Sequence, residues 1–385
     1  MPATFLPRLS SLLSRRSSRG LLRSLPAPPP PGRADLSTND YLSLASDPPP
    51  SRSSRSSRSS PVPSPIPSSP LLPPGSTGSR LLSGSHAPHS SFESALSAAH
   101  YPSSGASCAL LFNSGYDLNL SLLSALPGPD DVVLLDEEIH NSVHMGVRMG
   151  RAQQPNVRTF RHNDVADLER QLRSVPSSAA GVFLCVESYY SMSGTVAPLR
   201  RIFGALAGPS LPPDLPRGAL VDEAHASGVF GPEGLGLLQE AGLADHPLLL
   251  GATHTFGKAW GSHGAALLCP PAAGGGESPV IGAMLNFAKP LIYSTALAPE
   301  HAGGLEERLE LLRGPRGDER RAALLSNVAE FRALFEARFG KRRSGGGTFW
   351  LPEAGAPGPI QGVRVAGGNE GVVEAARMLG EEGYR

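Results

Sequence analysis

Three side chains of reactive type follow short apolar runs of the kind that form buried strands. Asp222 ends the run 219–221, and His225 stands three residues further on. Lys258 closes the segment 255–258 (TFGK), which follows a later run. In parallel sheets the carboxyl ends of the strands meet at one edge, where ligands bind. A lysine and a carboxylate at this edge suit pyridoxal phosphate, because the amine can bind the aldehyde and the carboxylate can keep the pyridine nitrogen protonated.

A turn between an expected strand and an expected helix offers a place for the phosphate of such a cofactor. The segment 113–116 (NSGY) joins the apolar run 109–112 to the helical stretch 116–126. Free backbone N–H groups at the start of a helix bind anions well. The turn therefore predicts a phosphate site at Gly115 and Tyr116.

A nucleotide-driven motor shares some of these residues, but their spacing argues against it. Residues 222–225 (DEAH) match a helicase box, and Gly257 with Lys258 resembles the end of a phosphate-binding loop. That loop needs four residues between its glycines and a Ser or Thr after its lysine. Five residues separate Gly251 from Gly257, and Ala259 follows the lysine. We expect no motor function.

A zinc site built from Asp222, His225 and His254 is a weaker alternative, because their spacing matches no compact ligand pattern. The chain has only three cysteines, far apart and without a CxxC pair: Cys108, Cys185 and Cys269. They indicate free thiols in a reducing compartment. We therefore expect no metal in the protein.

The overall composition excludes two classes of partner. The 385 residues include 34 basic and 34 acidic side chains, so the formal net charge is zero. A nucleic-acid-binding protein normally carries a clustered basic excess, so we expect no nucleic-acid partner. Because no apolar run reaches the roughly 18 residues of a membrane helix, we expect no membrane span. Apolar residues make up 40% of the chain, enough for a sizeable core.

The order of apolar and amphipathic segments indicates an α/β fold. From about residue 90, short apolar runs alternate with helical stretches, which is typical of a mostly parallel sheet with helices on both faces. The expected strands are 109–112, 132–135, 181–186, 219–221, 248–251 and 265–268. The expected helices are 91–100, 116–126, 164–173 and 199–207. After about residue 286, a long charged helix (318–338), two short strands (348–351 and 362–365) and a helix (370–380) indicate a smaller α+β domain.

We expect three regions: an N-terminal helix or arm (1–36), a large domain (37–285) and a small C-terminal domain (286–385). Residues 48–74 contain 10 Pro, 10 Ser and 3 Arg, which predicts a flexible low-complexity insertion in the large domain. The first 34 residues contain six Arg and no acid. Such a start is typical of a mitochondrial transit peptide, but a helix of the mature protein is favoured, and with it a cytoplasmic location.

Eight short segments give the chain a resemblance to a known family over nearly its whole length. They are 39–44 (NDYLSL), 75–84 (GSTGSRLLSG), 114–116 (SGY), 136–142 (DEEIHNS), 187–194 (ESYYSMSG), 222–228 (DEAHASG), 255–261 (TFGKAWG) and 293–295 (YST). In this order they resemble the α-oxoamine synthases, which belong to the fold type I enzymes that use pyridoxal phosphate.

The resemblance implies roles around the cofactor ring. It makes Lys258 the residue that carries the cofactor and moves the α-proton of the substrate, and it stacks His140 on the pyridine ring. It pairs Asp222 with the ring nitrogen, while His225 and Ser191 position the ring oxygen.

Further implied roles concern the phosphate and the substrate. Gly115, Tyr116 and Thr255 hold the phosphate. Ser294 and Thr295 reach the phosphate of a neighbouring subunit, because the family's active site lies at the interface of a homodimer. The substrate-binding residues implied by the resemblance are Arg23, Asn39 and His140.

Within the family, the segment 79–84 (SRLLSG) and the turn 161–164 (RHND) most resemble the biotin-pathway members. These condense L-alanine with pimeloyl-CoA, or another pimeloyl thioester, to 8-amino-7-oxononanoate, with loss of CO2. A sister synthase that uses glycine stays open. The family continues past the position of Arg385 into an arginine-bearing strand that binds the amino-acid carboxylate. We therefore expect the small domain to be incomplete, and an inactive fragment also stays open.

Overall fold

The computed structural model describes residues 6–20, 38–45, 73–339, 349–351 and 358–381. Arg23 and nearly all of the Pro/Ser segment 48–74 lie outside these residues. The chain divides into two compact units, one formed by Asn39–Ala366 and the other by Met1–Thr38 with Gly367–Arg385. In the second unit, the expected N-terminal and C-terminal helices are present as α1 (Leu6–Ser17) and α12 (Gly368–Glu381).

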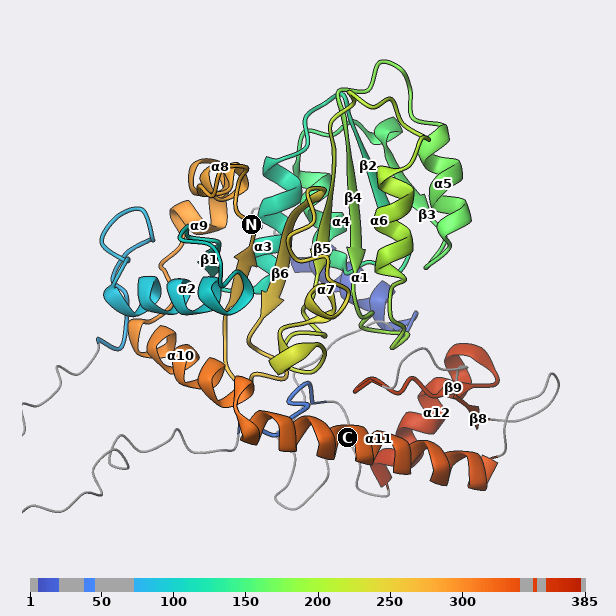
Figure 1. The fold of residues 1–385 in the computed structure, drawn as a ribbon. Coiled ribbons are helices and arrows are strands. Elements are labelled where there is room, and N and C mark those ends of the chain that lie inside the picture. Colours follow the sequence, from blue (N-terminus) through green and yellow to red (C-terminus); the bar gives the residue numbers. More distant parts are fainter. Residues whose placement is uncertain (1–5, 21–37, 46–72, 340–348, 352–357, 382–385) are drawn as a thin grey trace, which may run out of the picture. The chain divides into compact units, whose positions relative to one another are not determined.

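A seven-stranded sheet forms the centre of the larger unit (Figure 1). Its strands are β1 (Ala109–Phe112), β2 (Asp131–Asp136), β3 (Val157–Phe160), β4 (Gly181–Glu187), β5 (Arg217–Asp222), β6 (Leu249–Thr255) and β7 (Ala265–Leu268). They lie in the order β1-β7-β6-β5-β4-β2-β3, and β7 alone runs in the direction opposite to the other six. The expected mostly parallel α/β sheet is confirmed.

Two strands show where local sequence was a poor guide. The connection from β6 to β7 spans residues 256–264 and contains no helix, so β7 returns beside β6 in the antiparallel sense. Strand β3 was not among the expected strands. It lies at the edge of the sheet, where only Phe160 of its four residues is buried, so it lacks the continuous apolar run of the inner strands.

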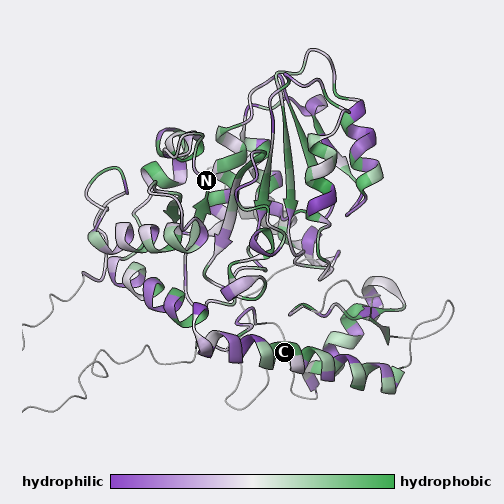
Figure 2. Ribbon diagram, in the orientation of Figure 1, coloured by the Kyte–Doolittle hydropathy of each residue, from purple (hydrophilic) through white to green (hydrophobic). Residues whose placement is uncertain are grey.

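Helices cover both faces of the sheet, as expected. One face is covered by α2 (Ala87–His100), α5 (Val165–Arg173), α6 (Leu199–Ala207), α7 (Leu237–Glu240) and α10 (Pro299–Arg313). The other face is covered by α3 (Gly115–Ala125), α4 (Asn141–Met149), α8 (Pro279–Phe287) and α9 (Lys289–Tyr293). The inner strands are mostly apolar, apart from the polar end of β6 (residues 253–255), while the helices carry polar residues away from the sheet (Figure 2). Burial on both faces explains why these strands read as continuous apolar runs.

The remaining elements of the larger unit are a long helix and several short segments. The expected helix 318–338 is present as α11 (Pro315–Phe339). The two expected short strands form an antiparallel pair, β8 (Phe349–Trp350) with β9 (Arg364–Val365). Two single turns of 3-10 helix are η2 (Gln154–Asn156) and η3 (Pro232–Gly234).

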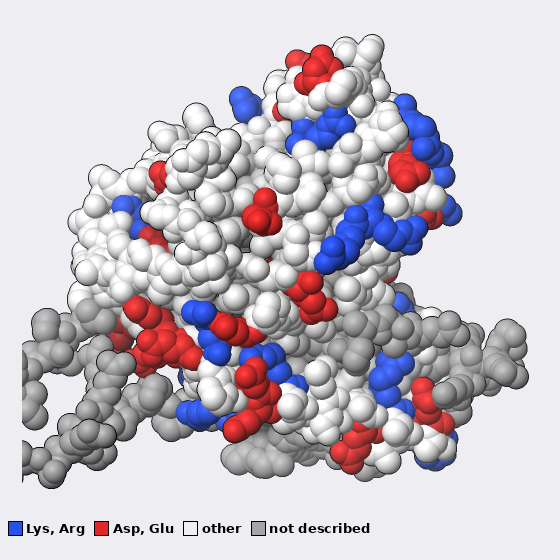
Figure 3. Space-filling model, viewed as in Figure 1, with Lys and Arg blue, Asp and Glu red and all other residues white. Residues whose placement is uncertain are grey.

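The surface in view carries basic and acidic side chains in small groups of both signs, mainly over its right and lower parts (Figure 3). This mixture agrees with the zero net charge of the chain. Among the described helices, none is both long enough and apolar enough to cross a membrane.

Candidate active site

A cavity of about 230 Å³ lies at the carboxyl ends of the parallel strands. Its walls come from the last residues of β4, β5 and β6, the first turn of α3 and the residue before α4. Eight of the residues singled out from the sequence line it: Asn39, Gly115, Tyr116, His140, Asp222, His225, Thr255 and Lys258. The topology thus brings together side chains that are more than 200 residues apart in the chain.

Asp222 is held as an acceptor at the end of β5. The residue is 7% exposed, and its carboxyl group accepts hydrogen bonds from Asn119 Nδ2 at 2.7 Å and from the Ala224 N–H at 2.8 Å. Asn119 is itself fixed, because it donates to Ser142 Oγ at 3.1 Å and accepts from Thr253 Oγ1 at 2.8 Å. N–H donors favour the charged form of a carboxyl group, so this site suits a cationic partner.

Lys258 follows β6 on a segment that the core anchors. Phe256 and Trp260, the aromatic residues near it, are buried and pack against each other with ring centroids 4.6 Å apart. Burial lowers the pKa of Lys258, although the charge of Asp222 opposes this shift. A lowered pKa increases the fraction of neutral amine, which is the form that attacks carbonyl groups and takes protons.

The two histidines of the cavity are also biased toward their neutral forms. Burial, together with the charges of Lys258 and His140, lowers the pKa of His225 to about 3. Its Nδ1 lies 2.7 Å from Tyr41 Oη, which lies 3.1 Å from Asn39 Oδ1. Burial likewise lowers the pKa of His140, against the opposing effect of Asp222.

His140 caps the start of α4. Its Nδ1 lies 2.7 Å from Ser142 Oγ and accepts the Ser142 N–H at 3.3 Å. The ring stands edge-on to Tyr116, at 6.3 Å between centroids and 86° between planes. Both rings line the cavity, so they form an aromatic wall beside Lys258 and Asp222.

Gly115 at the start of α3 is required by close packing. A Cβ atom there would lie 2.3 Å from Thr255 Cγ2, which is closer than two carbon atoms can approach. Ser114 ends the preceding turn and caps the helix, since its Oγ accepts the Asp117 N–H at 3.0 Å. The N–H groups of this first turn have no acceptor further back in the helix, so they can bind an anion beside Thr255.

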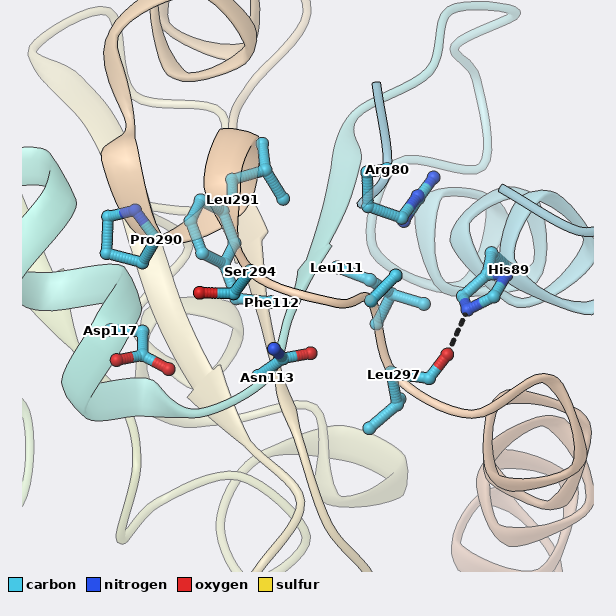
Figure 4. Close-up of a pocket in the computed structure, with 11 residues that line it drawn as sticks. Arg80, His89, Leu111, Phe112, Asn113, Asp117, Pro290, Leu291, Ser294 and Leu297 are labelled. Atoms are coloured by element: carbon cyan, nitrogen blue, oxygen red, sulfur yellow. Dashed lines mark hydrogen bonds between the residues drawn. The ribbon is translucent and has the colours of Figure 1, made fainter. Parts of the chain in front are cut away.

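Several expected site residues lie elsewhere. Ser191 does not line this cavity, but its N–H donates to Glu187 Oε2 at 3.2 Å. Ser294 lines a separate cavity of about 10 Å³ beside His89, enough for about one water molecule (Figure 4). Thr295 follows it, and its carbonyl oxygen accepts from Asn113 Nδ2 at 2.8 Å.

The structure does not bring the three residues of the zinc alternative together. Side chains alternate along a strand, so Thr253 and Thr255 face one side of β6 and His254 the other. His254 Nε2 lies 3.6 Å from Glu223 Oε2, away from Asp222 and His225 of the cavity. Within the described ranges, no group of three or more His, Cys, Asp or Glu residues is arranged to hold a metal ion.

Several residues of the site were not singled out from the sequence, among them His263, which also lines the cavity. Asn119 and Glu187 line the cavity, and Tyr41 contacts His225. Tyr41 and Glu187 belong to the segments 39–44 and 187–194, so the resemblance contained a signal for them. Asn119 lies inside α3 and carries no such signal.

The described residues fit pyridoxal phosphate. The cavity offers an amine for the aldehyde, a hydrogen-bonded carboxylate for the ring nitrogen and a helix start for the phosphate, contributed by Lys258, Asp222 and Gly115. These are the three functions that the cofactor demands of a protein.

Comparisons with known proteins identify the family of the chain. The family model "Aminotransferase class I and II" matches residues 33–356. The 8-amino-7-oxononanoate synthase of Emericella nidulans is 37% identical over 332 residues, which are 84% of this chain and 74% of that protein. The 8-amino-7-oxononanoate synthase of Mycolicibacterium gilvum is 36% identical over 307 residues, or 79% of this chain and 71% of the relative.

A solved structure extends the likeness to the fold and the cofactor. A chain described as SPT with PLP internal aldimine superposes with a TM-score of 0.61 at 28% identity, over 74% of this chain. This chain covers 64% of the length of that solved chain. On the family model, the curated relatives and this superposition, the chain belongs to the aminotransferase class I and II family and is a pyridoxal-phosphate-dependent acyltransferase of the α-oxoamine synthase type.

Proposed function

We propose that the protein condenses L-alanine with pimeloyl-CoA, or an equivalent pimeloyl thioester, to 8-amino-7-oxononanoate. The reaction forms a bond between the alanine Cα and the thioester carbonyl carbon, and it releases the thiol and CO2. The observation that carries the proposal is the cavity that joins Lys258 to Asp222. It is supported by 37% identity to a protein named for this product.

The chain's own residues divide the work at this site. When bound, pyridoxal phosphate supplies an aldehyde that holds an amine covalently and a ring that accepts the electron pair freed at Cα. We assign the covalent hold on the cofactor to the Lys258 amine, which also takes the proton from the alanine Cα. Asp222 keeps a proton on the ring nitrogen, because its carboxylate is fixed by two N–H donors.

The remaining assignments concern orientation. His140, at the start of α4, stacks on the cofactor ring. His225 binds the oxygen of that ring through one imidazole nitrogen, while Tyr41 contacts its other nitrogen, Nδ1. Ser191 is bound through its N–H to Glu187 of the cavity, and we propose that its side chain shares the ring oxygen with His225. Holding the two substrates together in one cavity accounts for much of the rate enhancement expected here.

Three further assignments concern the phosphate and the substrate. The first turn of α3, with Gly115 and Tyr116, binds the phosphate together with Thr255. Asn39, at the rim of the cavity, contacts the amino-acid carboxylate.

Two assignments require a second copy of the chain. We propose that Ser294 and Thr295 contact the phosphate in the partner subunit of a homodimer. Both side chains are exposed in the single chain, which leaves them free to do so.

A second candidate is a sister synthase with another amino acid. This candidate is supported by the 28% identity between this chain and the solved chain named SPT. The chemistry at Lys258 and Asp222 is the same for either substrate, so only the substrates distinguish the candidates.

The test compares substrates on the full chain loaded with pyridoxal phosphate. Thiol release and product mass are measured with L-alanine, glycine or L-serine, each offered with pimeloyl-CoA or palmitoyl-CoA. We expect turnover with L-alanine and pimeloyl-CoA and at most weak turnover with the other pairs. Turnover with glycine or serine in place of alanine would assign the protein to a sister activity.

Lys258 provides the matched control. Borohydride reduction should fix the cofactor on Lys258, and not on Lys289 or Lys341, the other two lysines of the chain. The variant Lys258→Ala should stay folded and release no thiol. A pyridoxyl group on another lysine would overturn the assignment of the site.

A further inference from the structure

A second buried carboxyl group stands beside Asp222 in the cavity. Glu187 is the last residue of β4 and pairs in register with Asp222, the last residue of β5. Paired residues of neighbouring parallel strands point to the same face of the sheet. Glu187 is 1% exposed and Asp222 7% exposed, and both line the cavity. Two carboxylates this close together in a buried site cannot both ionise without a large cost.

The hydrogen bonds show which of the two carboxyl groups holds the proton. Asp222 accepts two N–H groups, from Asn119 and Ala224, at 2.7 and 2.8 Å. Glu187 accepts the Ser191 N–H at a longer 3.2 Å, through Oε2, and the His140 backbone N–H acts on it more weakly still. Its Oε1 is buried without a hydrogen-bond partner among the described residues. Donated N–H groups stabilise the charged form, so the negative charge belongs on Asp222.

We propose that Glu187 is a positioning residue that stays protonated beside Asp222, so that the cavity presents one carboxylate, that of Asp222, to the cofactor ring and to Lys258. The sequence of the segment 187–194 does not by itself indicate this role for Glu187. The inference rests on the cofactor site proposed for Asp222 and Lys258, but not on the identity of the substrates.

The charged groups around Glu187 agree with this assignment. Burial and, after it, the charge of Asp222 raise the pKa of Glu187 to about 9, against the opposing charge of Lys258. Lys258 faces it from the segment after β6, and His140 and His225 line the same cavity from the start of α4 and the turn after β5. A second carboxylate would raise the pKa of Lys258 and so reduce its neutral amine. A protonated Glu187 avoids this effect.

Infrared spectroscopy tests the protonation directly. The carbonyl stretch of a protonated carboxyl group lies apart from the carboxylate bands. In a difference spectrum between the full chain and Glu187→Gln at neutral pH, we expect one such band to be lost, with and without pyridoxal phosphate. In the unchanged chain this band should fade as the pH rises past about 9. A difference spectrum that shows the loss of carboxylate bands instead would overturn the proposal.

Cofactor titration provides the second measurement. Glu187→Gln keeps a neutral group that can accept the Ser191 N–H, so the dissociation constant of pyridoxal phosphate should change by less than about threefold, well under the tenfold that corresponds to 1.4 kcal/mol. Glu187→Ala leaves Ser191 unpaired, and the constant should rise about tenfold or more. Glu169→Gln, an exposed carboxyl group on α5, is the matched control and should leave the constant unchanged.

The two measurements together separate the possible results. A purely structural Glu187 carboxylate would tolerate Gln in the titration but would show no protonated band. A Glu187→Gln variant that binds the cofactor as poorly as Glu187→Ala would also contradict the proposal. Failure to turn over alanine and pimeloyl-CoA leaves both measurements intact, so it bears on the proposed function and not on Glu187.

Discussion

The side chains of the cavity are held by neighbours that fix both their orientation and their charge. Asn119 bonds Asp222, Ser142 and Thr253 at once, so it ties the ends of β5 and β6 to the start of α4. Its amide makes two donations and one acceptance, which leaves little freedom to rotate. At this scale, the site depends on groups that do no chemistry themselves.

Gly115 gives a prediction at the residue scale. Gly115→Ala places a Cβ atom 2.3 Å from Thr255 Cγ2, so the first turn of α3 or the end of β6 must move. Overpacking of this kind costs about 1–3 kcal/mol of unfolding free energy, and it displaces the expected phosphate site. We expect lower stability in urea and at least tenfold weaker binding of pyridoxal phosphate.

A matched control lies in α10. A Cβ atom at Gly304 meets nothing within 4 Å, so Gly304→Ala should stabilise the protein by up to about 1 kcal/mol through helix propensity. Cofactor binding should not change. Equal effects of the two substitutions would contradict the packing argument at Gly115.

At the scale of elements, a buried ion pair joins the loop before α2 to the first strand. Arg80 binds both carboxylate oxygens of Glu93 on α2, at 2.7 and 3.0 Å. Glu93 Oε1 also accepts the Leu111 N–H of β1 at 2.7 Å. One carboxylate thus holds a loop, a helix and a strand together. The segment 79–84 that carries the family resemblance is part of this arrangement.

Removing Arg80 should therefore be costly. Arg80→Ala leaves the Glu93 carboxylate buried without its counter-charge, which typically costs about 3–5 kcal/mol. Adding Glu93→Gln should recover part of the loss, because the neutral amide can still accept the Leu111 N–H. Urea unfolding of both variants checks the order. Arg173→Ala, which breaks an exposed pair with Glu169, should cost less than about 1 kcal/mol.

Stability against pH belongs to the whole molecule, because it compares the complete folded and unfolded chains. His254 is a buried residue of β6, and burial lowers its pKa to about 3 in the folded protein. The ordinary value of 6.5 applies to the unfolded chain. Below pH 6.5 the unfolded chain therefore binds the extra proton, so the stability that depends on a neutral His254 is full above this pH and is lost as the pH falls toward 3.

The variant His254→Gln isolates this contribution. The difference in unfolding free energy between the unchanged chain and the variant should increase by about 1.4 kcal/mol per pH unit from pH 4 to 6. Above pH 6.5 the difference should level off. Urea unfolding at half-unit intervals measures it. A difference that is constant across this range would mean that His254 is protonated in the folded protein.

Local sequence determined most of the sheet, although β6 runs to Thr255, four residues past the expected end at Gly251. Continuous apolar runs mark β1, β2, β4, β5, β6 and β7, because each of these strands is buried on both faces. The cofactor chemistry followed from the same runs, since Asp222 and Lys258 are reactive side chains placed just after them. Strand β3 was missed because an edge strand with one buried residue leaves no such run.

Only the tertiary structure decided which polar residues share the cavity. Strand register and helix packing place Glu187 and Asn119 in it. Tyr41 contacts His225 of the cavity across 184 residues of chain. The physical reason is that a single polar residue leaves no pattern in the local sequence. Its burial and its hydrogen-bond partners depend on elements from distant parts of the chain that pack against it. Alternation along β6 turned His254 away from Thr255, and the pairing of β4 with β5 set Glu187 beside Asp222. The sequence by itself determined that a lysine and an aspartate meet at the end of a parallel sheet, and the packing of the strands decided the charge that surrounds them.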